Sequence, residues 1–154
     1  MSYLVDGHNL IPKVGLRLDS FDDEEGLILR LQEFCRLKRT QVEVYFDGAA
    51  AGTPTTRKVG AVTCHFVRRG STADSAIEVH LARLGKQARN WIVVSSDRRV
   101  QNAARAVHAI AVSSEEFALE ISKAGEKAML AKRETGLSPE EVDEWFGFFK
   151  GKKG

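Results

Sequence analysis

Short apolar runs alternate along the chain with longer segments of helical periodicity. The short runs are rich in β-branched and aromatic residues, which favour β-strands. The longer segments place apolar residues three and four positions apart, which is the spacing of an amphipathic helix. Strands that alternate with helices predict an α/β domain with a mainly parallel central sheet. The expected strands are 3–5, 42–46, 61–67, 91–94 and 109–112.

The expected helices are marked by capping residues and acidic starts. The acidic run 22–25 opens the first helix, because negative charge stabilises the positive end of the helix dipole. Ser71 or Thr72 is a candidate cap for the second helix, which is expected to end near Gly85. The segment 49–57, rich in Ala, Gly, Thr and Pro, is expected to be a loop. A sharp turn is expected at 6–9, directly after the first strand. The helices are expected to begin near residues 22, 73, 98, 114 and 138. The fourth of them is expected to run to about 130, and the last to span about 138–149.

Length and composition fit one globular domain. The chain has 154 residues, and we expect a single domain over 1–150 followed by a frayed basic tail at 151–154. Hydrophobic residues make up 43% and charged residues 29%, which excludes a wholly disordered chain. No apolar run approaches the roughly 18 residues of a membrane span, so no membrane contact is expected.

The small number of cysteines and the first residues of the chain bear on the cellular compartment in which the protein is expected. Cys35 and Cys64 are too few for a disulfide framework or a four-thiolate zinc site. The chain starts without a basic region ahead of a long apolar stretch, which argues against a secretory signal. A reduced, cytoplasmic location is therefore the simplest expectation.

Acidic residues follow the expected strands. Asp6, Asp47 and Asp97 come at the ends of three strands, and Asp74 lies at the start of the helix after another. The carboxyl ends of parallel strands meet at one edge of a sheet, so these four side chains are expected to gather there. Four carboxylates repel one another unless a cation neutralises them, and their oxygens suit Mg²⁺ or Mn²⁺. The sequence thus predicts a divalent-metal site that acts on phosphate esters.

Basic residues come in pairs, although the total charge is small. Lys and Arg number 23 against 21 Asp and Glu, a net charge of +2, so the distribution matters more than the total. The pairs Arg68–Arg69 and Arg98–Arg99 flank Asp74 and Asp97 in the sequence. We expect them to hold a polyanionic backbone near the metal.

Four motifs resemble those of a known family, in the same order and with suitable spacing. They are Leu-Val-Asp-Gly-His-Asn-Leu-Ile at 4–11, Tyr-Phe-Asp-Gly at 45–48, Ser-Thr-Ala-Asp-Ser-Ala-Ile-Glu at 71–78, and Val-Val-Ser-Ser-Asp-Arg-Arg-Val-Gln at 93–101. Each motif is weak alone, but the ordered set is fairly specific. Over about residues 2–130 the chain resembles the YacP-like NYN-domain proteins of the PIN-like nuclease superfamily.

The resemblance implies a fold, an activity and a site. The fold is a three-layer α/β/α PIN-like domain with a mainly parallel sheet of about five strands. The activity is endoribonucleolytic cleavage of RNA that depends on Mg²⁺ or Mn²⁺. By motif, Asp6, Asp47, Asp74 and Asp97 are the metal-binding catalytic acids. Three further residues support the site in this scheme: Asn9, which holds Asp6 or touches the ligand, and the secondary members Glu78 and Ser96.

The sequence departs from the family pattern at two positions and leaves other functions open. His8 stands where the family more often has Tyr, and Ser71 where an acid often precedes Thr-Ala-Asp, so one or two metals stay open. One alternative is an RNA-binding module of ribosomes or RNA-processing complexes, with little or no activity. Another is a phosphotransferase with Asp6 as nucleophile, although haloacid dehalogenase-type enzymes carry a second Asp where this chain has His8. The oligomeric state and the choice between RNA and DNA also stay open.

Overall fold

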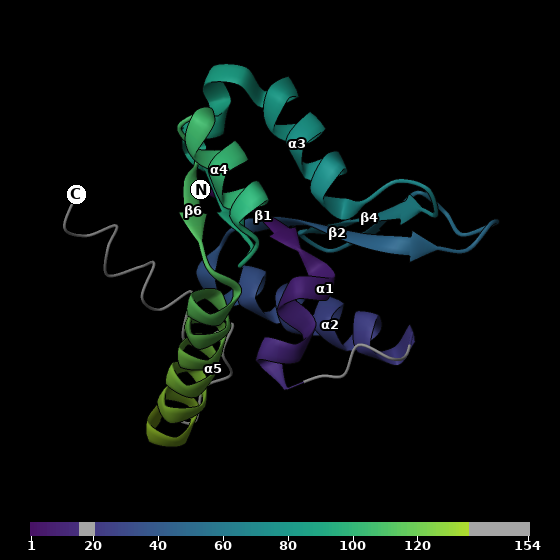
Figure 1. Ribbon diagram of the computed structural model, residues 1–154. Helices are drawn as coiled ribbons and strands as arrows, with labels where there is room; N and C mark the ends of the chain where they lie inside the picture. The colour runs from purple at the N-terminus through teal and green to yellow at the C-terminus, as the bar shows by residue number, and fades with distance from the viewer. Residues whose placement is uncertain (16–20, 136–154) are drawn as a thin grey trace.

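A six-stranded sheet forms the middle layer of the computed structural model, which describes residues 1–15 and 21–135 (Figure 1). The strands are β1 (Ser2–Asp6), β2 (Gln41–Ala49), β3 (Thr56–Val59), β4 (Val62–Arg68), β5 (Trp91–Val94) and β6 (Ile110–Val112). Their order in the sheet is β3-β4-β2-β1-β5-β6, and every neighbouring pair is parallel except β3 with β4. The mainly parallel α/β fold expected from the sequence is confirmed.

Helices cover both faces of the sheet, as the apolar strands require. The helices are α1 (Gly7–Leu10), α2 (Phe21–Lys38), α3 (Ala73–Leu84), α4 (Arg98–Ala106) and α5 (Ser114–Thr135), with 3-10 turns η1 (Ile11–Val14) and η2 (Gly85–Asn90). One core cluster joins Tyr3 of β1 to Phe34 of α2 and Phe117 of α5. The other joins Leu4 of β1 to α3 and α4. Burial on both faces explains why the central strands are continuous apolar runs.

Three local predictions differ from the structure. The expected loop 49–57 ends in strand β3, which pairs antiparallel with β4 and makes the sheet six strands wide instead of about five. The sequence Thr-Arg-Lys-Val hides this strand, because an edge strand exposes its polar side chains and shows no apolar pattern. The turn expected after β1 is the one-turn helix α1. Helix α5 continues to Thr135, beyond the expected end near 130.

The expected C-terminal helix and the basic tail lie outside the described residues. Within the described residues, no helix has both the length and the apolar character that crossing a membrane requires.

A close approach fixes the path of the chain after β1. At Gly7 the backbone passes so near β2 that a Cβ atom there would lie 2.5 Å from a ring carbon of Phe46 and 2.9 Å from the carbonyl oxygen of Tyr45. Only glycine fits without displacement of β2. This contact brings α1, with His8 and Asn9, against the carboxyl end of the sheet.

Candidate active site

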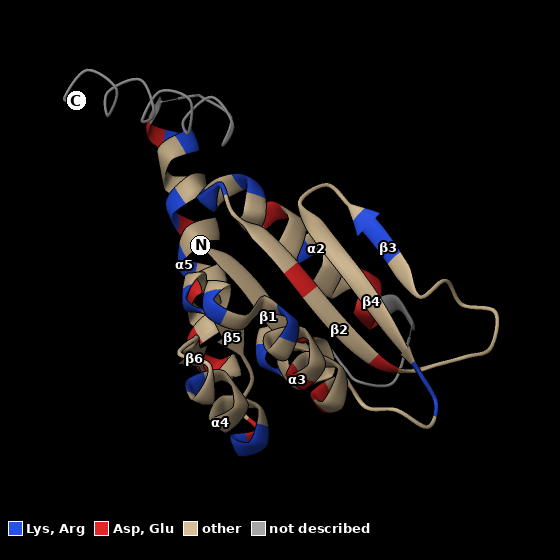
Figure 2. Ribbon diagram, turned by 90° about the horizontal axis from the view of Figure 1, so that it is seen from above, with Lys and Arg blue, Asp and Glu red and all other residues tan. Residues whose placement is uncertain are grey.

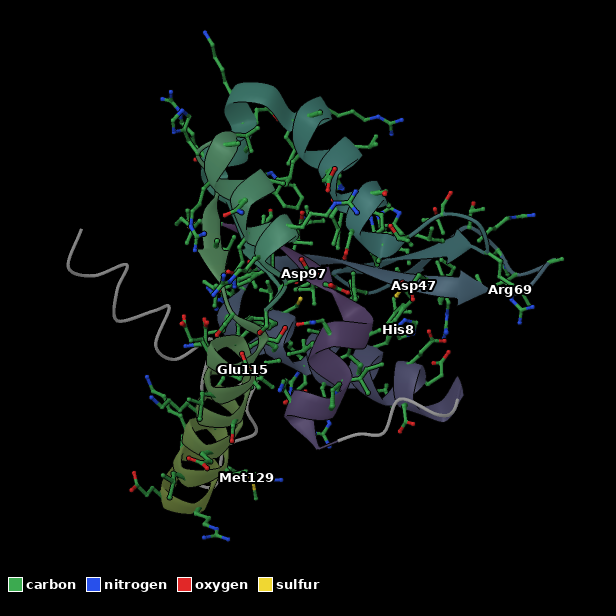
Figure 3. The ribbon with its side chains drawn as sticks, viewed as in Figure 1. His8, Asp47, Arg69, Asp97, Glu115 and Met129 are labelled. Atoms are coloured by element: carbon green, nitrogen blue, oxygen red, sulfur yellow. The ribbon has the colours of Figure 1, made fainter. Side chains whose placement is uncertain are left out.

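The four candidate aspartates lie at the carboxyl edge of the parallel strands. Asp6 ends β1, Asp47 lies near the end of β2, Asp74 is in the first turn of α3, and Asp97 precedes α4. The charges of Asp74 and Asp47 are close enough to raise the pKa of Asp6, and the charge of Asp97 is close enough to raise the pKa of Asp74. Figure 3 shows Asp47 and Asp97 at this same edge. The sequence-based expectation of a shared edge therefore matches their placement.

Asp6 is the most deeply placed of these acids. Its residue is 6% exposed, and burial together with the nearby Asp74 carboxylate raises its pKa to about 6. Hydrogen bonds from the Ser95 hydroxyl and the Asn9 backbone N–H oppose that rise. At neutral pH the buried negative charge of this site costs free energy. A bound cation would reduce that cost.

Asp74 and Asp97 stand at the starts of two neighbouring helices. Burial and the charge of Asp97 raise the pKa of Asp74, while Arg99 lowers it. Asp97 caps α4, since its Oδ1 accepts a 2.8 Å hydrogen bond from the backbone N–H of Arg99. Thr72, one of the two caps expected from the sequence, caps α3 by accepting from the N–H of Ser75. Asp74 is therefore not needed as the cap of its helix.

Asp47 is held by His8, the residue that stands where the family pattern more often has Tyr. The ring of His8 lies between two carboxylates, with Nδ1 2.7 Å from Asp47 and Nε2 2.8 Å from Glu24 of α2. These hydrogen bonds, first that of Glu24, raise the pKa of His8. Figure 3 shows His8 beside Asp47. His8 thus fixes one Asp47 oxygen and places positive charge at this end of the site.

Ser95, which was not among the predicted site residues, links two of the acids. Its buried hydroxyl donates to Asp6 over 3.3 Å and accepts from the backbone N–H of Asp97 over 3.1 Å. The carbonyl of Ser95 accepts from the side chain of Gln101 at 2.8 Å. The sequence feature that could have pointed to Ser95 is its place directly after an apolar strand and two residues before Asp97.

Asn9 and Ser96 lock the loop after β5 in place. The side-chain oxygen of Asn9 accepts from the backbone N–H of Ser96 at 2.9 Å and from the hydroxyl of Ser114 at 2.5 Å. The hydroxyl of Ser96 donates to Glu115 at 2.6 Å and accepts from the Ser114 N–H. Both residues therefore position backbone beside the acids, and the Ser96 hydroxyl itself faces α5.

The arginines divide into two groups. Arg99 forms an ion pair with Glu78, and its guanidinium also donates to the Ser75 hydroxyl, so it ties α4 to α3. Arg98 is exposed next to Asp97. Arg68 and Arg69 are exposed where β4 leads to α3, and Figure 2 shows this basic turn beside the acidic end of β2. In Figure 3, Arg69 lies at the outer end of the sheet, well away from Asp97.

The donor set fits a hydrated divalent cation better than a fully caged one. Among the described residues, no group of three or more His, Cys, Asp or Glu side chains is arranged to hold a metal ion by itself. Mg²⁺ commonly takes only one or two carboxylates and keeps several waters. In the described segments, no Lys or Arg forms a salt bridge with Asp6, Asp74 or Asp97, so their oxygens stay available. Asp6 with Asp74 is the best-suited pair, because the nearby charge of Asp74 raises the pKa of Asp6 and a bound cation would offset that repulsion.

Comparison with known proteins shows the family and the fold of the chain. Residues 3–144 match the family of YacP-like NYN domains. The fold is similar to that of Rae1 (YacP) from Bacillus subtilis: a crystal structure of a point mutant has 26% sequence identity and a TM-score of 0.72, over 92% of this chain and 89% of that chain. A second crystal structure of Rae1 (YacP) from the same organism has 21% identity and a TM-score of 0.68, over 99% and 94%. No curated protein matches the chain. The chain belongs to the YacP-like NYN-domain family, whose fold is of the PIN-like nuclease type.

Proposed function

We propose that this protein is a divalent-metal-dependent endoribonuclease that hydrolyses phosphodiester bonds of RNA. The observation that carries the proposal is the gathering of Asp6, Asp47, Asp74 and Asp97 at one edge of a nuclease-type fold, with Asp6 buried among like charges. Such a site gains most from a bound cation. Mg²⁺ or Mn²⁺ supplies the polarisation of a phosphoryl oxygen and the activation of a water.

Each residue of the edge has a defined task in this proposal. Asp6 and Asp74 supply carboxylate oxygens for the metal, and Asp97 and Asp47 extend the acidic surface on either side. Ser95 holds the Asp6 carboxylate and the backbone of Asp97 in fixed positions through its two hydrogen bonds. Since Asp97 uses Oδ1 as a helix cap, its Oδ2 is the atom that remains for metal or water.

The exposed arginines are proposed to hold the RNA backbone. Arg98 is exposed beside Asp97, whereas Arg68 and Arg69 lie on the turn between β4 and α3. A strand that contacts both groups would cross the acidic edge, with its phosphates paired at the two ends. Arg99 is assigned a smaller direct part, because Glu78 and Ser75 engage its guanidinium.

The first test is a cleavage assay with charge-removing variants. A labelled RNA pool is incubated with the parent, Asp6→Asn and Asp97→Asn in EDTA, Mg²⁺ or Mn²⁺. Asn is also a good helix cap, so Asp97→Asn removes the charge while it preserves the start of α4. We expect metal-dependent cleavage by the parent and a loss of about 100-fold or more in each variant, since even outer partners of a metal site contribute 10–100-fold.

The matched control is Glu116→Gln. Glu116 is an exposed carboxylate in the first turn of α5, away from the four aspartates in the sequence, and its removal should leave cleavage unchanged. Parental rates in both Asp→Asn variants would refute the proposed site. Cleavage by the parent in EDTA would refute the metal dependence.

An RNA-binding module without useful activity is the second candidate, and one observation favours it. Asp47 and Glu78 are engaged by His8 and Arg99, which reduces the acids available to a metal. Such a module, as part of a ribosomal or RNA-processing complex, would retard RNA in a gel with salt-sensitive affinity. Its signature is RNA that stays intact in every metal.

A further inference from the structure

A hollow lies beside the acidic edge, between α3 and strands β2 and β4. Its volume is about 620 Å³, within the roughly 300–1,000 Å³ of small-ligand sites. None of the four aspartates lines it. Ser71, Thr72 and Ser75 line one end, and Arg83 lines the other. The hollow therefore follows α3 from its first turn to its last.

Flat rings line the middle of the hollow. Tyr45 and His65 are stacked, with ring centroids 4.4 Å apart and planes at 16°. The Tyr45 hydroxyl is 2.8 Å from Nδ1 of His80, which fixes the tyrosine against α3. Tyr45 is nearly buried, whereas the His65 side chain is 24% exposed. His65 is thus a ring already supported by an aromatic neighbour and open to the hollow.

A carboxylate in the hollow is oriented but not fully used. Oε1 of Glu43 lies 2.7 Å from Nε2 of His65. Its other oxygen is 3.6 Å from Nε2 of His80, which is too long for a hydrogen bond. The bond from His65 also lowers the pKa of Glu43, so this group stays an acceptor at neutral pH. The Glu43 carboxylate is therefore ready to accept from N–H groups of a ligand.

The hollow adjoins the acidic edge at the start of α3. Asp74 lies between Thr72 and Ser75 in the chain, and both neighbours line the hollow. The Ser75 hydroxyl also accepts from Arg99, which lies two residues after Asp97. Asp74 and the hollow therefore share the first turn of α3.

We propose that this hollow binds one unpaired nucleotide of the RNA strand, adjacent to the phosphate held at the acidic edge. The proposal rests on the proposed function for its choice of polymer. His65 stacks on the base, Glu43 accepts from base N–H groups, and Arg83 pairs with a backbone phosphate. Unpaired bases are commonly bound in this way, by stacking on rings next to a cationic group.

The test measures binding without cleavage. Fluorescein-labelled single-stranded RNA is titrated in EDTA with the full-length parent, His65→Ala, His65→Phe and Arg83→Ala. Arg105→Ala, an exposed arginine of α4 that does not line the hollow, is the charge-matched control. We expect His65→Ala to weaken binding about 5- to 100-fold and His65→Phe to retain most of it, because stacking survives in phenylalanine. Arg83→Ala should weaken binding more than Arg105→Ala does. It should also reduce the slope of log K against log salt concentration by about 1, the value for one lost phosphate contact.

A second measurement keeps the result independent of folding defects. In the parent, NMR signals of the imidazole rings of His65 and His80 should shift on RNA addition, while those of exposed His108 should not. Unshifted His65 and His80 signals, or parental affinity in both His65→Ala and Arg83→Ala, would overturn the nucleotide subsite.

Cleavage assays then separate the two proposals. If the parent cleaves RNA while His65→Ala and Arg83→Ala bind and cleave like it, the subsite is wrong and the nuclease assignment stands. If no metal supports cleavage but these variants lose affinity, the subsite stands and the nuclease assignment falls.

Discussion

At the scale of single residues, the most informative group is Asp6. Its residue is 6% exposed, and burial with the charges of Asp74 and Asp47 raises its pKa to about 6. In the unfolded chain, the same carboxyl has the ordinary aspartate pKa of 3.8. The native state without metal therefore holds this proton over a pH range in which the unfolded chain has already released it. The free energy of unfolding consequently falls as the pH rises from about 4 to about 6.

Asp6→Asn should stabilise the metal-free protein. In EDTA at about pH 7 we expect the free energy of unfolding to rise by about 1–3 kcal/mol, because the variant no longer buries a repelled charge. Below about pH 4 the gain should vanish, since Asp6 is then protonated in both states. Urea unfolding at several pH values measures this difference. A variant less stable than the parent at about pH 7 would show that hydrogen bonds outweigh repulsion.

At the scale of elements, the turn from β1 into α1 depends on one glycine. A methyl group at position 7 would meet the Phe46 ring at 2.5 Å and the Tyr45 carbonyl oxygen at 2.9 Å. We expect Gly7→Ala to lower the free energy of unfolding by about 1–3 kcal/mol through overpacking. Gly125→Ala is the control: a Cβ atom there meets nothing within 4 Å, and the helix should gain up to about 1 kcal/mol. Thermal unfolding of the two variants should shift in opposite directions.

The loop between β5 and α4 depends on Asn9. Its side-chain oxygen accepts from the Ser96 N–H and from the Ser114 hydroxyl, so Asn9→Ala leaves two donors unpaired. We expect a loss of about 1–3 kcal/mol in the free energy of unfolding, together with a slower cleavage rate because the backbone before Asp97 is released. Asn102→Ala, on the exposed side of α4, should change neither quantity. An Asn9→Ala protein with parental stability would contradict this role.

At the scale of the whole molecule, charge is arranged so that a cation should stabilise the fold. The net charge is only +2, yet four carboxylates share one edge of the sheet. We expect Mg²⁺ or Mn²⁺ to raise the Tm of the parent. At a metal concentration of ten times the Kd, the free energy of unfolding should rise by about 1.4 kcal/mol. The rise should be much smaller in Asp6→Asn and unchanged in Glu116→Gln. Equal shifts in all three proteins would indicate non-specific ion binding.

Some features could be read from local pattern, and others were hidden by it. The apolar strands and the aspartates that follow them predicted the parallel sheet and its acidic edge, because the position of a strand end depends on nearby residues. Strand β3 was not predicted, because its Arg57 and Lys58 face solvent at the edge of the sheet and leave no apolar pattern. The roles of His8 and Ser95 were not predicted either, because Glu24 and Asp47 lie 16 and 39 residues from His8, and Asp6 lies 89 residues from Ser95.

The sequence by itself determined the α/β alternation, the helix cap at Ser71 or Thr72, and the four acids at strand and helix ends. These follow from hydrophobic periodicity and capping chemistry, which act over a few residues. Only the tertiary structure decided which groups meet: His8 with Asp47 and Glu24, Arg99 with Glu78, and the ring pair Tyr45–His65 beside α3. Such contacts depend on how helices and strands pack, because packing sets the distances between residues far apart in the chain and thereby their burial and charge.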